Sequence, residues 1–153
     1  MKIELIPLTA ADPEIHELAR IHQSPSVAEY LSLSDHYFDY VTGTEGVVYY
    51  KIIADGVLAG GIHCESNGEI LFLSICVREE SRRLGIAETA LRKLFSSLSG
   101  EAGWIEVSIE KTNTPSLALF FKLGFQKTGE AEELLTLRLA SKGTRFAITN
   151  LIM

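Results

Sequence analysis

"RRLGIA", residues Arg82–Ala87, lies between two stretches of very different character. The preceding residues, "EILFLSICV", are apolar and rich in β-forming side chains, and the following residues, "ETALRKLFSSLS", are apolar at helical spacing. This pattern predicts a strand that passes through a glycine turn into a helix. The N-terminus of such a helix carries unpaired backbone N–H groups and the positive end of the helix dipole, so it can bind an anion.

The residue types within the turn favour a pyrophosphate site. Gly85 lets the backbone approach a ligand closely, and Ala87 keeps the next side chain small. Arg82 and Arg83 can add positive charge at the rim. The turn is not a P-loop, which needs GK followed by Ser or Thr, and it lacks the GxGxxG of a dinucleotide site. The alternative is a tight strand–helix turn whose arginines merely face solvent.

Two turn signals organise the sheet before this helix. Asp55-Gly56 and Asn67-Gly68 are the strongest short signals for two-residue hairpins. They predict three consecutive antiparallel strands, "VVYYKIIA", "VLAGGIHCES" and "EILFLSICV".

The same turns predict a register for these strands. Tyr49 would oppose Ile62 across the first pair. Ser66 would oppose Glu69 across the second pair. Because side chains alternate between the two faces of a strand, Tyr49, Cys64 and Glu69 would then share one face. In this register Cys64 lies far from the other cysteine, so no disulfide is expected.

Apolar periodicity divides the rest of the chain into further elements. In chain order it predicts a strand Lys2–Leu8, a helix capped by Asp12 with Pro13 at its first position, a short helical region in "SPSVAEYLSLSDHYFDYV", the helix after "RRLGIA", a strand "GWIEVSIE", a helix opened by Pro115 and closed by Gly124, and two final strands in "LLTLRLA" and "RFAITNLI". This order predicts one domain of residues 1–153, a mixed α/β sandwich.

Composition excludes several classes of function. The net charge of −6 argues against general nucleic-acid binding, which needs a basic surface. No apolar run reaches the ~20 residues that cross a membrane. The first residues, "MKIELIPLTAADPE", become acidic too early for a secretory signal, so a cytoplasmic location is expected. Two cysteines are too few for a disulfide scaffold, and His16 and His22 lack zinc-pair spacing, so no metal site is predicted.

A second motif follows the glycine turn. The stretch from Asn113 to Phe125 reads "NTPSLALFFKLGF", a helix that ends in Lys-Leu-Gly-Phe. Together with Arg82-x-x-Gly85-x-Ala87 it resembles the GNAT acetyltransferase superfamily. The resemblance extends to the whole order of strands and helices. It implies an α/β (α+β) fold of the GNAT type, with a mixed, mostly antiparallel sheet flanked by helices on both faces, and acetyl-CoA as the acyl donor.

The resemblance also implies which residues hold the donor. In this family the backbone of the glycine turn binds the CoA pyrophosphate, the main chain of the preceding strand pairs with the pantetheine arm, and an asparagine hydrogen-bonds the arm. Carried over to this sequence, the donor-binding residues are Ile75, Cys76, Val77, Arg82, Arg83, Leu84, Gly85, Ile86, Ala87, Asn113, Ser116 and Phe120.

The catalytic pattern of the family is incomplete here. The tyrosine that often protonates the departing sulfur corresponds to Phe120, and the usual strand carboxylate corresponds to Leu71. Glu69 lies two residues further out, so it is a candidate general base, with Tyr49 as a second candidate. A solvated, turn-flanking glutamate is the alternative for Glu69. Cys64 is a candidate acyl carrier, with a structural thiol as the alternative.

These observations leave two functions open. The first is an N-acetyltransferase that moves an acetyl group from acetyl-CoA to an amine of a small molecule or a protein by direct attack, with Tyr30 and Tyr37 contacting the acceptor. The second is a non-catalytic acyl-CoA-binding or regulatory module. The apolar tail Arg145–Met153 suggests a homodimer interface, with a monomer whose tail folds back on its own sheet as the alternative.

Overall fold

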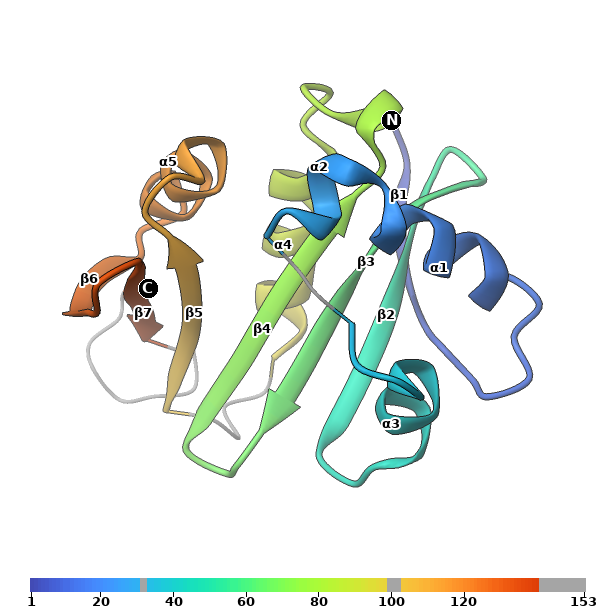
Figure 1. Ribbon diagram of the computed structural model, residues 1–153, viewed down its shortest axis with the longest axis horizontal. Helices are drawn as coiled ribbons and strands as arrows, with labels where there is room; N and C mark the ends of the chain where they lie inside the picture. Colours follow the sequence, from blue (N-terminus) through green and yellow to red (C-terminus); the bar gives the residue numbers. More distant parts are fainter. Residues whose placement is uncertain (31–32, 99–102, 141–153) are drawn as a thin grey trace. The chain divides into compact units, whose positions relative to one another are not determined.

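The computed structural model describes residues 1–30, 33–98 and 103–140 (Figure 1). In chain order the elements are β1 (Ile3–Pro7), α1 (Ile15–Gln23), α2 (Pro25–Ala28), α3 (Tyr37–Gly43), β2 (Val47–Ala54), β3 (Val57–Ser66), β4 (Ile70–Val77), the 3-10 turn η1 (Glu79–Ser81), α4 (Ile86–Ser97), β5 (Trp104–Glu110), α5 (Thr114–Lys122), β6 (Gln126–Glu130) and β7 (Leu134–Ala140). Among these described residues no helix is long and apolar enough to cross a bilayer.

The strands form one hydrogen-bonded sheet in the order β1-β2-β3-β4-β5-β7-β6. β4 and β5 run parallel, whereas the pairs β1–β2, β2–β3, β5–β7 and β6–β7 are antiparallel. The predicted mixed, mostly antiparallel sheet is therefore confirmed. The chain divides into two compact units, one of Met1–Glu65 with Ile75–Ala90, and one of Ser66–Ser74 with the chain from Leu91 onward.

The core of the first unit lies under three helices. Figure 1 shows α1, α2 and α3 on one face of β2 and β3. Their apolar side chains and those of the strands form one buried cluster of Leu8, Leu18, Ile21, Val27, Val41, Val47, Tyr49, Ile53, Leu58 and Cys76. The single short helical region expected in "SPSVAEYLSLSDHYFDYV" is two separate helices, α2 and α3.

Helix α1 begins later than the sequence predicts. Asp12 does not cap the helix, because the helix begins at Ile15. Instead, Asp12 Oδ1 accepts the Glu14 N–H at 2.9 Å and the Asp12 carbonyl accepts the Ile15 N–H at 3.2 Å. Asp12 therefore holds the turn before the helix.

The register of β2 and β3 differs from the predicted one because β3 contains a bulge. Pairing shifts between Ile52 and Ile53, where β3 carries one extra residue, Ala59. Tyr49 consequently opposes His63 and not Ile62. The predicted common face of Tyr49 and Cys64 is therefore wrong, since a one-residue shift moves a side chain to the other face.

The second hairpin is also shifted. The Asn67 N–H donates to the Ile70 carbonyl at 3.2 Å, so Gly68 and Glu69 are the central turn residues. The predicted pairing of Ser66 with Glu69 is wrong for this reason.

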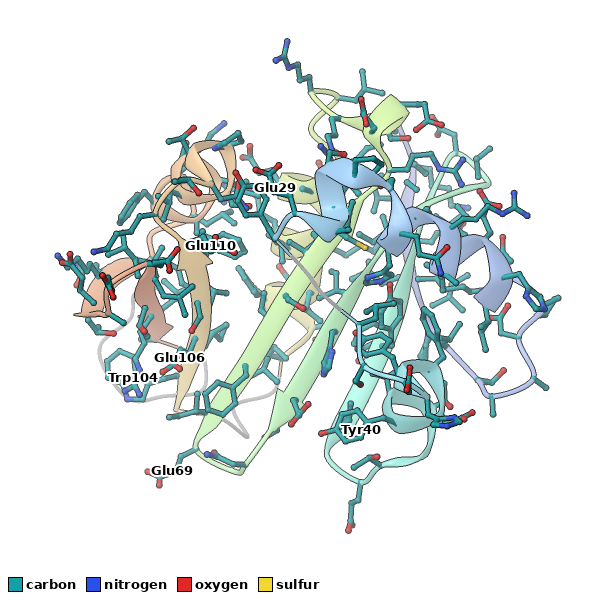
Figure 2. The ribbon with its side chains drawn as sticks, in the orientation of Figure 1. Glu29, Tyr40, Glu69, Trp104, Glu106 and Glu110 are labelled. Atoms are coloured by element: carbon teal, nitrogen blue, oxygen red, sulfur yellow. The ribbon has the colours of Figure 1, made fainter. Side chains whose placement is uncertain are left out.

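The second unit contains β5, the strand predicted in "GWIEVSIE". β5 alternates between buried Ile105, Val107 and Ile109 and the opposite face, which carries Trp104, Glu106 and Glu110 (Figure 2). The helix α5 has Pro115 in its first turn, and Gly124 follows it with φ +98°. β6 was not predicted. The expected strand "RFAITNLI" and the tail Arg145–Met153 lie outside the described residues.

Candidate functional site

The glycine turn presents a row of free main-chain donors. The Gly85 carbonyl accepts the Thr89 N–H at 3.0 Å, so α4 begins directly after Gly85. Two residues of the turn have left-handed backbones, Arg83 with φ +64° and Gly85 with φ +79°. Within the described part of the chain, no hydrogen bond is made by the N–H groups of Arg83, Leu84, Gly85, Ile86 and Ala87. This is the arrangement of donors that an anion at a helix N-terminus requires.

Space remains open beside these donors. A Cβ added to Gly85 would meet no atom within 4 Å. Leu84 is 61% exposed, so the turn is covered by no other part of the described chain at this point. The turn therefore offers both the hydrogen-bond donors and the open space that the predicted pyrophosphate site requires.

Arg82 has a more specific role than rim charge. Its Nε donates to the Val77 carbonyl at 3.2 Å, and its main-chain N–H donates to the Glu79 carbonyl at 3.2 Å. These two bonds fold the turn back onto the end of β4. The side chain of Arg82 thus fixes the position of the turn relative to the strand that leads into it.

The main chain at the end of β4 bonds to β3 along one of its two edges. There the Arg78 N–H donates to the Ala59 carbonyl at 2.7 Å. Since N–H groups alternate in direction along a strand, the Val77 N–H points to the opposite edge. An extended ligand can pair with that edge as an added strand.

A buried polar cluster lies beneath the same strand. The Tyr49 hydroxyl lies 2.8 Å from His22 Nε2 and 3.9 Å from Cys76 Sγ. Burial lowers the pKa of His22 to about 4, with a further contribution from His63, and raises the pKa of Tyr49 well above its usual value. His22 Nδ1 is buried and has no hydrogen-bond partner among the described residues. Tyr49, a predicted catalytic residue, is thus an almost fully buried phenol that does not ionise near neutral pH.

A second polar chain lies beside this cluster. The Tyr37 hydroxyl lies 2.7 Å from His63 Nδ1, and His63 Nε2 lies 2.9 Å from Glu65 Oε1. Tyr37 was predicted as an acceptor contact, whereas His63 and Glu65 were not predicted at all. The signal for them was the His-x-Glu spacing in a strand, which places both side chains on one face.

The predicted site residues of the other unit have structural partners of their own. Asn113 Oδ1 accepts the Ser116 N–H at 3.4 Å, which caps α5. Phe120 is 3% exposed and packs edge to face on Phe125, with ring centroids 5.1 Å apart. The Phe120 ring offers no proton to a departing sulfur.

The remaining candidates lie nearer the surface. Figure 2 shows Glu69 in the turn before β4, with its side chain pointing away from the sheet. Its carbonyl accepts the N–H groups of Gly103 and Trp104 at 2.6 and 3.0 Å. Tyr30 is half-buried just after α2. No group of three or more His, Cys, Asp or Glu side chains that could hold a metal occurs in residues 1–30, 33–98 and 103–140.

Solved structures of the same fold cover nearly the whole chain. RimL, a ribosomal L7/L12 alpha-N-protein acetyltransferase in complex with coenzyme A, has a TM-score of 0.80 at 14% identity over 94% of this chain and 96% of its own. The ribosomal-protein-S18-alanine N-acetyltransferase of Escherichia coli has a TM-score of 0.72 at 17% identity over 92% and 94%. Campylobacter jejuni N-acetyltransferase PseH with acetyl coenzyme A has 0.72 at 12% identity over 91% and 99%. A search of the curated proteins found no match.

The model of the Acetyltransferase (GNAT) family matches residues 14–125, which is more than half of the chain and includes both sequence motifs. The match runs from α1 through the end of α5, and thus through the free N–H groups of the glycine turn and the strand edge before it. The protein therefore belongs to the GNAT family of acetyltransferases, whose acyl donor is acetyl-CoA.

Proposed function

We propose that this protein transfers an acetyl group from acetyl-CoA directly to an amine, with the turn Arg82–Ala87 holding the CoA pyrophosphate. The observation that carries the proposal is the row of five free N–H groups from Arg83 to Ala87 beside the open space at Gly85. Backbone donors at the start of a twelve-residue helix suit two adjacent phosphates, because the helix dipole adds to their hydrogen bonds.

The strand edge before the turn suits the rest of the donor. The main chain of Ile75–Val77 would pair with the pantetheine arm, which brings the thioester carbonyl close to the strand. The Val77 N–H, which points to that edge, could donate to the carbonyl oxygen as it becomes an oxyanion. A single donor of this kind is worth about 10²–10³ in rate in other acyl-transfer enzymes. Asn113 and Ser116 are proposed as further contacts to the arm.

Direct attack is favoured over an acetyl-cysteine intermediate. The chain has two cysteines, and both are buried. Burial raises the pKa of Cys64 to about 12 and that of Cys76 to about 11. Since the thiolate is the nucleophile, neither side chain is reactive near neutral pH.

The non-catalytic alternative rests on Phe120. Its ring packs in the core of its unit where the family often has an acidic hydroxyl. However, a thiol with a pKa of about 8.5 leaves as a thiolate far more readily than an alcohol leaves as an alkoxide. The loss of one acid therefore slows the reaction without preventing it, and turnover decides between the two functions.

The test combines binding and turnover. We expect calorimetry to show one CoA site per chain and a thiol reagent to detect CoA release when acetyl-CoA is mixed with 2-phenylethylamine, 1,4-diaminobutane or a peptide with a free N-terminal alanine. The peptide is included because two structural neighbours are named as protein N-acetyltransferases. Intact-mass spectra should show an acetylated amine and no acetylated enzyme. Binding without thiol release would favour the regulatory module, and absent binding would contradict both functions.

Several expectations from the sequence stay predictions. The family match spans both compact units, which supports a single domain over residues 1–153. A cytoplasmic location and a homodimer formed through Arg145–Met153 remain untested. Light scattering on the full chain and on a chain ending at Ser141 would decide the second point, with a monomeric mass for the full chain contradicting the dimer.

A further inference from the structure

The hydrogen-bonded chain Tyr37–His63–Glu65 has the connectivity of a proton relay. Tyr37 comes from α3, and His63 and Glu65 come from the same face of β3. The oxygen-to-nitrogen distances are 2.7 Å and 2.9 Å, both within the range of direct proton transfer. An imidazole held between a hydroxyl and a carboxylate is the arrangement by which hydrolases activate a hydroxyl group.

The carboxylate determines the protonation of the ring. An ionised Glu65 can only accept, so His63 Nε2 must carry the proton that lies between them. In the neutral imidazole, Nδ1 then carries a lone pair, which accepts a hydrogen bond from the Tyr37 hydroxyl. Glu65 thus fixes the tautomer in which His63 can take a proton from Tyr37.

Tyr40 of α3 lies beside the outer end of the chain. The neighbouring Glu65 raises the pKa of Tyr40, and the Tyr40 and His63 ring centroids lie 6.4 Å apart. The Glu65 side chain is 41% exposed and that of His63 is 19% exposed. The outer end of the chain therefore reaches solvent, where a proton can leave.

The inner end of the chain lies on the face that carries the Cys76 side chain. The Tyr37 and Tyr49 rings have centroids 6.3 Å apart, and the Tyr49 hydroxyl lies 3.9 Å from Cys76 Sγ. Cys76 is the middle residue of Ile75–Val77, the strand end proposed to hold the thioester. The Tyr37 hydroxyl therefore belongs to the same layer of side chains as the proposed acyl site.

We propose that Tyr37, His63 and Glu65 form the relay that removes the proton from the acceptor amine, with the Tyr37 hydroxyl touching the amine. The proposal rests on the acetyltransferase function argued above. It assigns the acceptor to amines that arrive as cations, because a relay ending in a carboxylate attracts an ammonium group and is needed only if the amine is protonated.

The proton balance of the step is complete. The ammonium group gives one proton to the Tyr37 oxygen while the Tyr37 proton passes to His63 Nδ1, and Glu65 stabilises the resulting imidazolium. The neutral amine then forms the C–N bond, the C–S bond breaks, and the second amine proton leaves with the thiol. His63 returns its proton to water.

The other candidate bases are less suited to this task. Glu69 lies in an exposed turn and its side chain points to solvent (Figure 2). His22 is 5% exposed, and its low pKa makes it a weak base at neutral pH. Tyr49 is 1% exposed, so the His22–Tyr49 pair lies away from solvent, unlike the partly exposed Glu65.

The test compares Tyr37→Phe, His63→Gln and Glu65→Gln with the unaltered enzyme. At pH 7 and with 1,4-diaminobutane, we expect each variant to lower kcat/KM by about 10²-fold or more, as loss of a general base does. The affinity for CoA should change less than twofold. As pH rises towards about 10, the rates should recover, because the amine then arrives neutral. The side chain of Glu65 is partly exposed, so Glu65→Gln should fold even if Tyr37→Phe does not.

Several ionisable side chains around His63 contribute to the pH dependence of the rate. Those around His63 are Tyr37 and Tyr40 from α3, Glu65 from its own strand, Tyr49 from β2, His22 from α1 and Cys76 from β4. Glu65→Asp should restore part of the rate at pH 7, since it keeps the charge.

A matched control is Tyr50→Phe, on the opposite face of β2 from Tyr49, which should leave the rate unchanged. A loss that does not recover at high pH would mean a structural role and would overturn the relay, as would a loss confined to Glu69→Gln. Absence of thiol release with all three amines despite normal CoA binding would also overturn the relay. Failure of the unaltered protein to bind CoA would instead contradict the proposed function.

Discussion

Gly85→Asp is expected to weaken CoA binding by at least 100-fold. The aspartate side chain would enter the space beside the five free N–H groups, where a Cβ now meets nothing within 4 Å. Its carboxylate would accept hydrogen bonds from those N–H groups, and its negative charge would repel the pyrophosphate. Two like charges about 4 Å apart at a protein surface repel by about 4 kcal/mol, which is close to a 1,000-fold change in affinity.

A matched variant at a second glycine separates the effect of the new charge at the phosphate site from the effect of backbone strain. Gly56 has φ +82°, close to the +79° of Gly85, and also has open space around it. Gly56→Asp therefore carries the same strain and charge in the β2–β3 turn, and it should bind CoA normally. Gly85→Ala, which adds bulk without charge, should lie between. Calorimetry of all three folded variants with CoA is the measurement, and unchanged affinity in Gly85→Asp would contradict the phosphate site.

The parts of the site that the sequence predicted are those whose conformation depends on residues adjacent in the sequence. The glycine turn and the hairpins depend on backbone conformations that only a few residue types adopt. Gly85 and Gly56 both have the positive φ that their positions require. The helix after the turn follows from apolar spacing alone, since α4 buries Ile86, Ala90 and Leu91.

The relay could not be predicted in the same way, because it depends on one extra residue in β3. The bulge at Ala59 places His63 opposite Tyr49. The consecutive glycines Gly60 and Gly61 were a sequence signal for this bulge, since glycine within a strand often marks a bulge or a close approach of another group. A Cβ at Gly60 would collide with the Cys76 carbonyl, and one at Gly61 would collide with the Tyr49 ring. The sequence shows the two glycines but not what approaches them.

β6 was not predicted because its own residues carry no strand signal. Its residues, "QKTGE", are polar and mostly exposed, so they carry no apolar alternation. The strand exists because β7 pairs with it, with Leu137 opposite Lys127. An edge strand of this kind is specified by its neighbour, and charged side chains such as Lys127 protect its open edge from other chains.

Lys51→Met is expected to lower the free energy of unfolding by about 3 kcal/mol, as loss of one partner from a buried ion pair does. Lys51 Nζ lies 2.7 Å from Asp12 Oδ2 and 2.8 Å from Glu14 Oε1, and the side chains of Lys51 and Asp12 are 10% and 9% exposed. Methionine would fill the volume but leave the Asp12 carboxylate buried without a counter-ion. The midpoint of thermal unfolding should fall by about 6–12 °C for a chain of this length.

The pH dependence of that loss has a definite sign. Burial is the largest single influence on the Asp12 carboxylate and raises its pKa. The Lys51 hydrogen bond, the Glu14 N–H and the charge of Lys51 together outweigh burial and hold the pKa of Asp12 below the usual 3.8. In the intact protein Asp12 therefore contributes stability above pH 3.8 that is lost as pH falls through the lower folded pKa. Without Lys51 its hydrogen bond and its charge are lost while burial and the Glu14 N–H bond stay, so the folded pKa of Asp12 rises from its value in the intact protein. The deficit of Lys51→Met should thus be full at pH 7 and shrink as acid protonates Asp12.

Lys111→Met provides the control for this prediction. Lys111 Nζ lies 2.6 Å from Glu130 Oε2, but the two side chains are 35% and 46% exposed. An exposed pair of this kind contributes about 0–1 kcal/mol, so the control should lose little stability. Urea unfolding of both variants at pH 7 and at about pH 3, below the ordinary carboxyl pKa, measures the difference. Equal losses in the two variants, or a Lys51→Met deficit that grows in acid, would show that Lys51 does not hold β2 to the start of α1 through its charge.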